Sequence, residues 1–204
     1  MFITFEGLDC SGKTTQATLL VNRLQKLGKQ VVSLREPGGT PISEKIRDLL
    51  LDNQHGEMNQ KTELLLFSAA RTQLVSQVIR PALEQKKIVI CDRFYDSTTA
   101  YQGYGRGLDL QEVKLINSVA VSGTIPDITL FIDIEVDEIF RRRTAAGLSV
   151  DRMESSGKEF YEGVRKGFLE LCKAESQRCV VIDGMKQKEE IHNLIWNAIQ
   201  QRLS

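Results

Sequence analysis

A glycine-bounded run near the start of the chain has residue types and a spacing that suit phosphate chemistry. The backbone of such a loop folds into a concavity whose N–H groups face phosphate oxygens, and the start of a following helix adds its positive dipole. We expect Lys13 to reach the β- and γ-phosphates of a nucleotide and the Thr14 hydroxyl to ligate Mg²⁺. The run matches the Walker A pattern and reads Gly7-Leu8-Asp9-Cys10-Ser11-Gly12-Lys13-Thr14.

The residues around this loop predict the elements that must hold it. The apolar run 2–5 precedes it and is typical of a buried strand, and apolar residues at helical spacing follow it over 13–27 until Gly28. A strand before the loop and a helix after it disfavour the alternative of a glycine-rich turn without chemistry. Cys10 is either a reactive thiol at a helix N-terminus or a small residue that fits the loop.

An acid and a base stand side by side at the end of a second apolar run. Residues 88–91 are continuously apolar and lead into Asp92 and Arg93. A buried parallel strand that ends in an aspartate resembles a Walker B element, so Asp92 is a candidate Mg²⁺ ligand, directly or through water. Arg93 beside it is a candidate for holding a phosphate. The alternative is a local ion pair at a strand end.

Five apolar strands alternate with helical patterns along the chain, which predicts an α/β fold with a doubly wound parallel sheet and helices on both faces. With the Walker A loop, this predicts the architecture of a P-loop NTPase. We expect one domain over 1–204, with a glycine-rich loop at 103–107 and a helix over 61–79 that Pro81 kinks or restarts. The predicted strands are 2–5, 30–35, 88–92, 128–133 and 179–183, and helices include 110–121 and 136–146.

The composition is balanced. The chain has 204 residues with 27 Lys+Arg and 27 Asp+Glu, so no overall charge favours nucleic acid or a membrane surface as a partner. No basic, apolar leader and no run of about 18 apolar residues is visible, so we expect a cytoplasmic protein. The four cysteines lack C-x-x-C spacing and are expected to be reduced thiols, and His55 and His192 are expected at the surface.

The motifs narrow the class of nucleotide-binding protein. The chain has neither an Asn-Lys-x-Asp guanine motif nor a Leu-Ser-Gly-Gly-Gln signature of transport ATPases. Adjacent opposite charges at 92–93 suit a kinase, because two polyanions must be brought together there. At this point the chain resembles the thymidylate kinase family of the bacterial type, nearly from end to end. The matching segments are 5–7, 35–40 (Arg-Glu-Pro-Gly-Gly-Thr), 67–71 (Phe-Ser-Ala-Ala-Arg), 92–94 (Asp-Arg-Phe) and 97–103 (Ser-Thr-Thr-Ala-Tyr-Gln-Gly).

The resemblance implies an activity and an assembly. Members of the family transfer the γ-phosphoryl group of ATP to dTMP with Mg²⁺, which gives dTDP for dTTP synthesis, and are typically cytoplasmic homodimers. The implied fold is nucleoside monophosphate kinase-like, with a lid over about 143–154. Because the second pKa of the dTMP phosphate is about 6, that phosphate is already a dianion at neutral pH and requires no general base.

The resemblance also implies which residues bind dTMP. Phe67 and Arg71 are four apart, so they share a helix face where a ring could stack on the base and a guanidinium could bind its carbonyl edge. Without the resemblance, Phe67 would be interpreted as a core residue, Arg47 as a solvated one and Glu36-Pro37 as a turn. Asp9 could simply cap the helix. The implied dTMP-binding residues are Asp9, Glu36, Pro37, Arg47, Phe67, Arg71, Arg93, Ser97, Thr98, Tyr101 and Gln102.

A lid arginine is expected to join Lys13, Arg93 and Asp92 in catalysis, with Arg143 and Arg152 as the candidates. One class of the family places a catalytic arginine where this chain has Cys10, and some relatives have further arginines near 145–148, where this chain has Ala145, Ala146 and Leu148. The resemblance therefore leaves open which lid arginine acts. The segment 183–186 also lacks a Gln-Pro pair that is frequent in the family, so adenine contacts are not assigned.

Two other functions are compatible with the residues. The chain could phosphorylate another small acceptor, such as dUMP, dCMP or a nucleoside. It could also be a regulatory protein that changes conformation on binding ATP without phosphorylating a small molecule, although Lys13, Asp92, Arg93 and Arg71 together disfavour that interpretation.

Overall fold

A computed structural model describes residues 1–147, 152–153 and 156–203 of the chain. Its centre is one sheet of five parallel strands in the order β2-β3-β1-β4-β5. The parallel five-stranded sheet expected from the sequence is confirmed. The strands are β1 (Phe2–Glu6), β2 (Val31–Arg35), β3 (Ile88–Asp92), β4 (Ile128–Asp133) and β5 (Cys179–Asp183).

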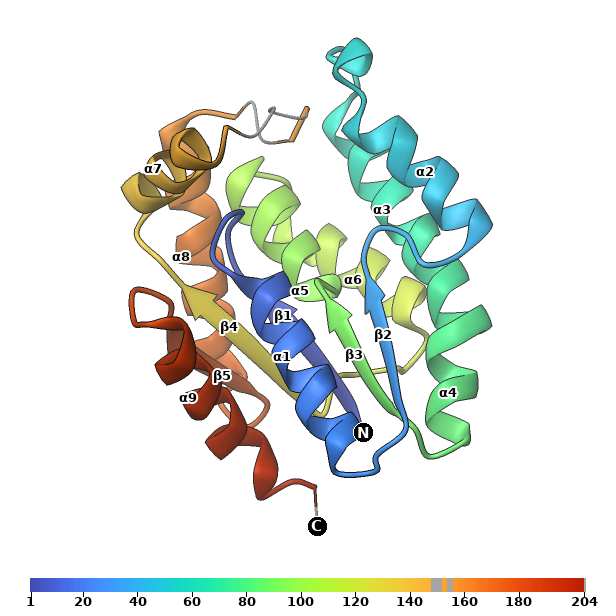
Figure 1. The fold of residues 1–204 in the computed structure, drawn as a ribbon. Coiled ribbons are helices and arrows are strands. Elements are labelled where there is room, and N and C mark those ends of the chain that lie inside the picture. The colour runs from blue at the N-terminus through green and yellow to red at the C-terminus, as the bar shows by residue number, and fades with distance from the viewer. Residues whose placement is uncertain (148–151, 154–155, 204) are drawn as a thin grey trace.

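Helices connect the strands and cover both faces of the sheet (Figure 1). Their starts follow sequence signals: the Thr40 side chain accepts from the Ser43 N–H at the start of α2, and Asp109 caps α6 in the same way. The helices are α1 (Lys13–Lys26), α2 (Pro41–Leu51), η1 (Asn53–His55), α3 (Gln60–Leu74), η2 (Val75–Ile79), α4 (Arg80–Glu84), α5 (Tyr95–Thr98), η3 (Thr99–Gly105), α6 (Leu110–Val121), α7 (Val136–Ala146), α8 (Lys158–Ala174) and α9 (Lys188–Gln200).

Alternate residues of each central strand face opposite helical layers. Ile3 and Phe5 of β1 pack with Leu20 and Leu24 of α1 and with the apolar face of α9. Phe2 of β1 packs on the other face of the sheet with residues of α3, η2 and α5. Both faces of the central strands are therefore buried, which explains why these strands read as continuous apolar runs.

The carboxyl ends of the strands meet at one edge of the sheet, where the loops after β1, β2 and β3 converge (Figure 1). β1 lies at the centre of the sheet, between β3 and β4. The phosphate loop that follows β1 is therefore next to the point where the strand order reverses. In open α/β sheets this crevice is where ligands bind. The sheet thus brings the phosphate loop, the 36–40 loop and the Asp92-Arg93 pair together.

The expected glycine-rich loop at 103–107 is wrong for most of its length. Residues Thr99–Gly105 continue α5 as a π-helical segment, η3, against α8. A β-carbon at Gly105 would lie 2.7 Å from Phe160 and Val164, and one at Gly103 would lie 2.7 Å from Leu110. The glycines therefore allow close helix packing there and do not mark a flexible turn.

The helix predicted over 61–79 is present as α3 followed by the π-helical η2, and Pro81 lies at the start of α4, as expected for a proline that restarts a helix. One other expectation is wrong: Cys172 and Cys179 form a disulfide, whereas reduced thiols were expected. Sequence spacing could not reveal this pair, because β5 begins only a few residues after α8 ends and turns back alongside it. Within the described residues, no helix has the length and apolarity needed to cross a membrane.

Candidate active site

The phosphate loop has a backbone that requires glycine. Gly7 has φ 143°, and a β-carbon there would lie 2.6 Å from the carbonyl oxygen of Ile132. Gly12, at the N-cap of α1, has φ 93° and supplies no side chain to the first N–H groups of the helix. The buried Ser11 hydroxyl likewise has no hydrogen-bond partner among the described residues. Unsatisfied donors at a helix N-terminus are what a phosphate group would satisfy.

Lys13 is buried within this loop. Its ammonium Nζ donates to the carbonyl of Leu8 over 2.7 Å, and the residue is 6% exposed. Burial and the nearby Arg93 guanidinium lower the pKa of Lys13 to about 8, although Asp92 and Asp9 act in the opposite direction. Lys13 therefore remains mostly protonated at neutral pH, and a bound anion would stabilise its charge further.

Thr14 and Asp92 meet beside Lys13. The Thr14 hydroxyl donates to Oδ2 of Asp92 over 2.5 Å, and Thr14 is exposed. A hydroxyl and a carboxylate at the mouth of a phosphate loop are hard oxygen donors of the kind that Mg²⁺ prefers, and Mg²⁺ completes its shell with waters and substrate phosphates. No cluster of three or more His, Cys, Asp or Glu side chains able to hold a metal occurs in the described part of the chain. This donor set therefore fits Mg²⁺ shared with a nucleotide.

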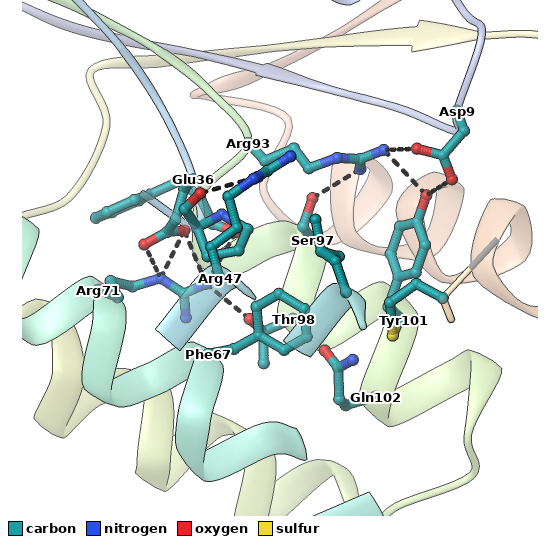
Figure 2. A pocket seen from close by; sticks show the side chains of 14 residues that line it. Asp9, Glu36, Arg47, Phe67, Arg71, Arg93, Ser97, Thr98, Tyr101 and Gln102 are labelled. Atoms are coloured by element: carbon teal, nitrogen blue, oxygen red, sulfur yellow. Dashed lines mark hydrogen bonds and ion pairs between the residues drawn. The ribbon is translucent and has the colours of Figure 1, made fainter. Parts of the chain in front are cut away.

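Arg93 connects the phosphate loop to the neighbouring cavity (Figure 2). It adopts φ 72°, an uncommon backbone conformation for a residue with a side chain. Its guanidinium donates to the Gly7 carbonyl over 2.9 Å and to Asp9 over 2.6 Å, and it also reaches the hydroxyls of Ser97 and Tyr101. Burial would raise the pKa of Asp9, but Arg93 and Lys13 lower it below its ordinary value. Asp9 is therefore ionised and orients Arg93.

Glu6, the last residue of β1, holds the turn that carries Arg93. Its carboxyl group accepts from the Phe94 N–H over 2.7 Å and from the Ser97 hydroxyl over 2.5 Å, and it is fully buried. Burial, with Asp96 nearby, raises the pKa of Glu6 from 4.5 to about 8. Glu6 is not among the site residues predicted from the sequence, because a glutamate after an apolar run does not show which loop it contacts.

We expect Glu6→Gln to remove a pH dependence of stability. The folded pKa of Glu6 is about 8 and the unfolded value is 4.5, so the folded state binds more protons between these values. The wild-type free energy of unfolding therefore falls as pH rises through this window, and the substitution removes that loss. Denaturant unfolding at pH 5 and at pH 8 should show the variant gaining stability relative to wild type at the higher pH. An equal difference at both pH values would contradict the role given to Glu6.

One cavity opens beside Arg93 at the carboxyl edge of the sheet (Figure 2). Its empty space, counted with the open mouth, is about 690 Å³. Every residue that the resemblance implied for dTMP lines this cavity. The lining residues are Asp9, Glu36, Pro37, Arg47, Phe67, Arg71, Arg93, Ser97, Thr98, Tyr101 and Gln102, with Leu51, Phe94 and Met153 in addition.

Arg71 is the most enclosed charge in this wall. Its Nε donates to both carboxylate oxygens of Glu36 over 2.9 Å, and its other nitrogens donate to Asn117 and Thr98. The side chains of Arg71 and Glu36 are 1% and 2% exposed. Burial raises the pKa of Glu36, and the charge of Arg71 opposes that rise. The pair holds α3 against the 36–40 loop and fixes the guanidinium at the cavity.

Phe67 is partly buried one helical turn before Arg71; it lines the cavity and also packs against an apolar core cluster. Arg47, on α2, donates to the Pro37 carbonyl over 2.9 Å. Tyr101 contributes its hydroxyl, which donates to Asp9 over 3.3 Å. The cavity thus combines one aromatic face with several cations and hydrogen-bonding groups.

The two candidate lid arginines lie on opposite sides of the cleft. Arg143, on α7, donates to the Tyr161 hydroxyl over 3.1 Å, and Tyr161 donates in turn to Asp9. Arg152 forms an ion pair with Glu63 over 2.7 Å and donates to the Leu50 carbonyl, on the α2–α3 side. Much of the predicted lid falls at 148–151 and 154–155, including Leu148, and lies outside the described residues.

Arg142, which is not among the predicted site residues, contacts the phosphate loop. Its guanidinium donates to the carbonyl of Cys10 over 3.2 Å and to that of Gly184 over 3.1 Å. Glu138 accepts from both Arg141 and Arg142. Arg141, Arg142 and Arg143 are consecutive on α7, so their side chains point in different directions. The packing of α7 therefore decides which of them reaches the phosphate loop.

Comparisons with known proteins agree on one family. The thymidylate kinase family model matches residues 5–195. The chain is 48% identical to a thymidylate kinase from Chlorobaculum parvum, over 98% of this chain and 95% of the relative, and 45% identical to one from Caldanaerobacter subterraneus, over 99% and 96%. The crystal structure of thymidylate kinase from Ehrlichia chaffeensis superposes with a TM-score of 0.80 at 40% identity and covers 98% of each chain.

The fold and the comparisons together decide the class of protein. A parallel sheet with a phosphate loop at its carboxyl edge is typical of P-loop NTPases, and the solved thymidylate kinase has the same fold over nearly its whole length. A regulatory protein without an enzyme activity is not what these similarities indicate. The chain belongs to the thymidylate kinase family, an enzyme family that phosphorylates dTMP to dTDP with ATP in dTTP synthesis.

Proposed function

We propose that this chain carries out the transfer between ATP on the phosphate loop and dTMP in the cavity bordered by Phe67 and Arg71. The observation that supports this arrangement best is the position of Arg93. It donates to the Gly7 carbonyl of the phosphate loop and also lines the cavity, so both nucleotides would share it. A cation between two phosphate groups is what phosphoryl transfer requires.

In the cavity, the thymine ring would stack on Phe67, with the Arg71 guanidinium at its carbonyl edge. Arg47 and Arg93 would hold the phosphate of dTMP. Asp9 and Tyr101 would lie beside the sugar, where the Tyr101 side chain would crowd a 2′-hydroxyl. The remaining proposed contacts come from Glu36, Pro37, Ser97, Thr98 and Gln102, all of which line the same cavity.

The chemistry then needs no base. An oxygen of the dianionic dTMP phosphate attacks the γ-phosphorus of ATP, the bond to the β–γ bridging oxygen breaks, and ADP leaves with that electron pair. The obstacle is repulsion, since two like charges 4 Å apart cost about 4 kcal/mol at an effective dielectric of 20. Lys13 and Arg93 would offset this cost, and Arg142 and the loop backbone would hold the ATP phosphates in place.

Thr14 and Asp92 would hold Mg²⁺, Asp92 either directly or through water. When bound, the ion would offset part of the negative charge of the ATP phosphates. The chain's own residues fix the other cations. Arg143 is the lid arginine that we place in the transfer step, because its partner Tyr161 contacts Asp9 beside Arg93. Arg152 would instead close the dTMP side of the cleft.

We propose further that residues 1–204 form one domain, with the lid over about 143–154, and that the protein works in the cytoplasm as a homodimer.

Exposed apolar residues on α3 and α6 support the dimer: Leu65 is 55% exposed, Leu115 67% and Val119 69%. The Lys61–Glu112 ion pair, at 2.9 Å, joins these helices one turn before Leu65 and Leu115, so the apolar residues share one surface. Sedimentation equilibrium should give twice the 23.0 kDa chain mass, and a monomer at micromolar concentration would contradict the dimer.

Thermal unfolding in the presence of nucleotides tests the assignment of the cavity. Bound ligand raises the melting temperature by an amount set by its affinity, so dTMP should protect at lower concentration than dCMP or AMP. Phe67→Ala should reduce protection by dTMP and leave protection by ATP and Mg²⁺ unchanged, since the two ligands occupy different walls of the cleft. Stronger protection and faster ADP formation with dCMP than with dTMP would overturn the choice of acceptor.

A further inference from the structure

A buried carboxylate lies behind the cavity, outside its lining. Glu63 stands on α3 one helical turn before Phe67 and two turns before Arg71, so the three share a face of the helix. Its side chain is 2% exposed. Nitrogen donors from three other residues reach it: Nε2 of Gln102 at 2.9 Å, Nε of Arg106 at 3.2 Å and a guanidinium nitrogen of Arg152 at 2.7 Å.

The two arginines keep Glu63 ionised. Burial would raise the pKa of Glu63, but the hydrogen bonds from Gln102, Arg106 and Arg152 and the charge of Arg106 lower it below the ordinary value. An ionised carboxylate has no proton to donate and can only accept hydrogen bonds. Whatever side chain faces Glu63 must therefore turn a donor toward it.

Gln102 lies between Glu63 and the cavity. It is 1% exposed and lines the cavity wall. Because its amide nitrogen must face Glu63, its carbonyl oxygen is directed the other way, and in Figure 2 that oxygen lies on the side of Phe67 and Thr98. A base stacked on Phe67 would meet an acceptor there. The opposite amide orientation would point the carbonyl oxygen at a carboxylate, which is repulsive.

An acceptor at this position distinguishes pyrimidines. Thymine and uracil carry a hydrogen on N3 and can donate to the Gln102 oxygen, whereas N3 of cytosine is an unprotonated acceptor and would face that oxygen lone pair to lone pair. A site built to bond one pattern of donors rejects the other strongly, because its buried polar group is left unpaired.

We propose that Glu63 is a positioning residue for base specificity: it locks the Gln102 carboxamide with its oxygen toward the base, so that the cavity accepts rings with an N3–H and rejects cytosine. This inference rests on the proposed placement of dTMP in the cavity. Glu63 does not touch the substrate and acts through Gln102. Glu63 also pairs with the guanidinium of Arg152, whose backbone N–H donates to the Leu51 carbonyl.

Glu63→Gln tests the proposal, because an amide can both donate and accept and so permits both orientations of Gln102. We expect the ratio of kcat/KM for dTMP to kcat/KM for dCMP to fall by at least about tenfold. The ratio of dTMP to dUMP should stay unchanged, since both bases carry N3–H. Glu63→Asp keeps the charge near Arg106 and Arg152 but withdraws the carboxylate from Gln102, so it should shift the same ratio even if the glutamine variant folds poorly.

Two controls separate positioning from structural support. Arg106→Gln removes another partner of Glu63 without freeing the Gln102 amide, so it should lower the melting temperature and leave the dTMP/dCMP ratio unchanged. In a Gln102→Leu background, Glu63→Gln should change the ratio no further, because the two residues act as one unit. An unaltered ratio in both folded Glu63 variants, or equal shifts in the dCMP and dUMP ratios, would overturn the proposal.

Measurements on the wild-type enzyme and on Phe67→Ala distinguish a wrong placement of dTMP from a wrong role for Glu63. If wild type itself does not prefer dTMP to dCMP, or if Phe67→Ala leaves dTMP protection unaltered, the placement of dTMP in the cavity is wrong. If both results support that placement and the Glu63 variants keep their selectivity, the placement stands and only the role of Glu63 fails.

Discussion

Lys13→Ala is expected to lower kcat by about 10²–10³-fold, the loss typical of removing one preorganised donor from a transition state that gains negative charge. The structure gives the reason, because the Lys13 ammonium is buried inside the phosphate loop and held at the Leu8 carbonyl. Its charge is therefore fixed where the γ-phosphoryl group would pass. A coupled assay of ADP formation with saturating ATP and dTMP measures the effect.

The fold should survive this change. Burial lowers the pKa of Lys13 to about 8, which means that the empty loop disfavours its charge and loses little when the charge is removed. Lys13→Met, which retains the apolar stem, is the matched control and should be as inactive as the alanine variant, with a melting temperature near that of wild type. Activity within tenfold of wild type in either variant would contradict the role of Lys13.

Arg71→Met should cost about 3–5 kcal/mol of stability, because it leaves the Glu36 carboxylate buried without its charge partner. The wild-type pair is nearly closed to solvent, and the guanidinium also holds Asn117 and Thr98. In the variant, the buried Glu36 carboxylate avoids the cost of an unpaired charge only by binding a proton. The decrease in the free energy of unfolding should therefore be larger at pH 8 than at pH 5. Denaturant unfolding of the two proteins at both pH values measures it.

A double variant separates charge from packing. Glu36→Gln combined with Arg71→Met removes both charges and should recover most of the lost stability, yet dTMP protection should remain weak because the guanidinium at the base is gone. A single variant that loses less than about 1 kcal/mol, equally at both pH values, would show that the Glu36–Arg71 pair does not hold this wall together.

The fold was predictable where the chain carries local signals. β3, β4 and β5 have the expected bounds because each is a largely apolar run that ends in an acid, and α6 begins directly after its cap residue Asp109. The segment after Thr98 was not predictable, because two of its glycines indicate a turn in isolation. Packing of Gly103 and Gly105 against other helices decides that the chain stays helical, and the residues that contact Gly105, on α8, lie far along the sequence.

The residues of the site likewise fall into those that the sequence predicts and those that only the fold reveals. The phosphate loop can be identified from spacing, and the resemblance to a family leads to the cavity residues. The supporting residues could not be found, since Glu6, Glu63 and Arg142 act through contacts between elements distant in the sequence. A glutamate on a helix would be expected to face solvent, and only the fold shows that Gln102, Arg106 and Arg152 converge on Glu63.

A crystal structure with dTMP and a non-hydrolysable ATP analogue would test the central claim most directly. We expect both molecules in one cleft, with the thymine ring against Phe67, the triphosphate along the Gly7–Thr14 loop and the Arg93 guanidinium between the two phosphate groups. Density for dTMP outside the cavity, or occupancy by either molecule that excludes the other, would contradict it.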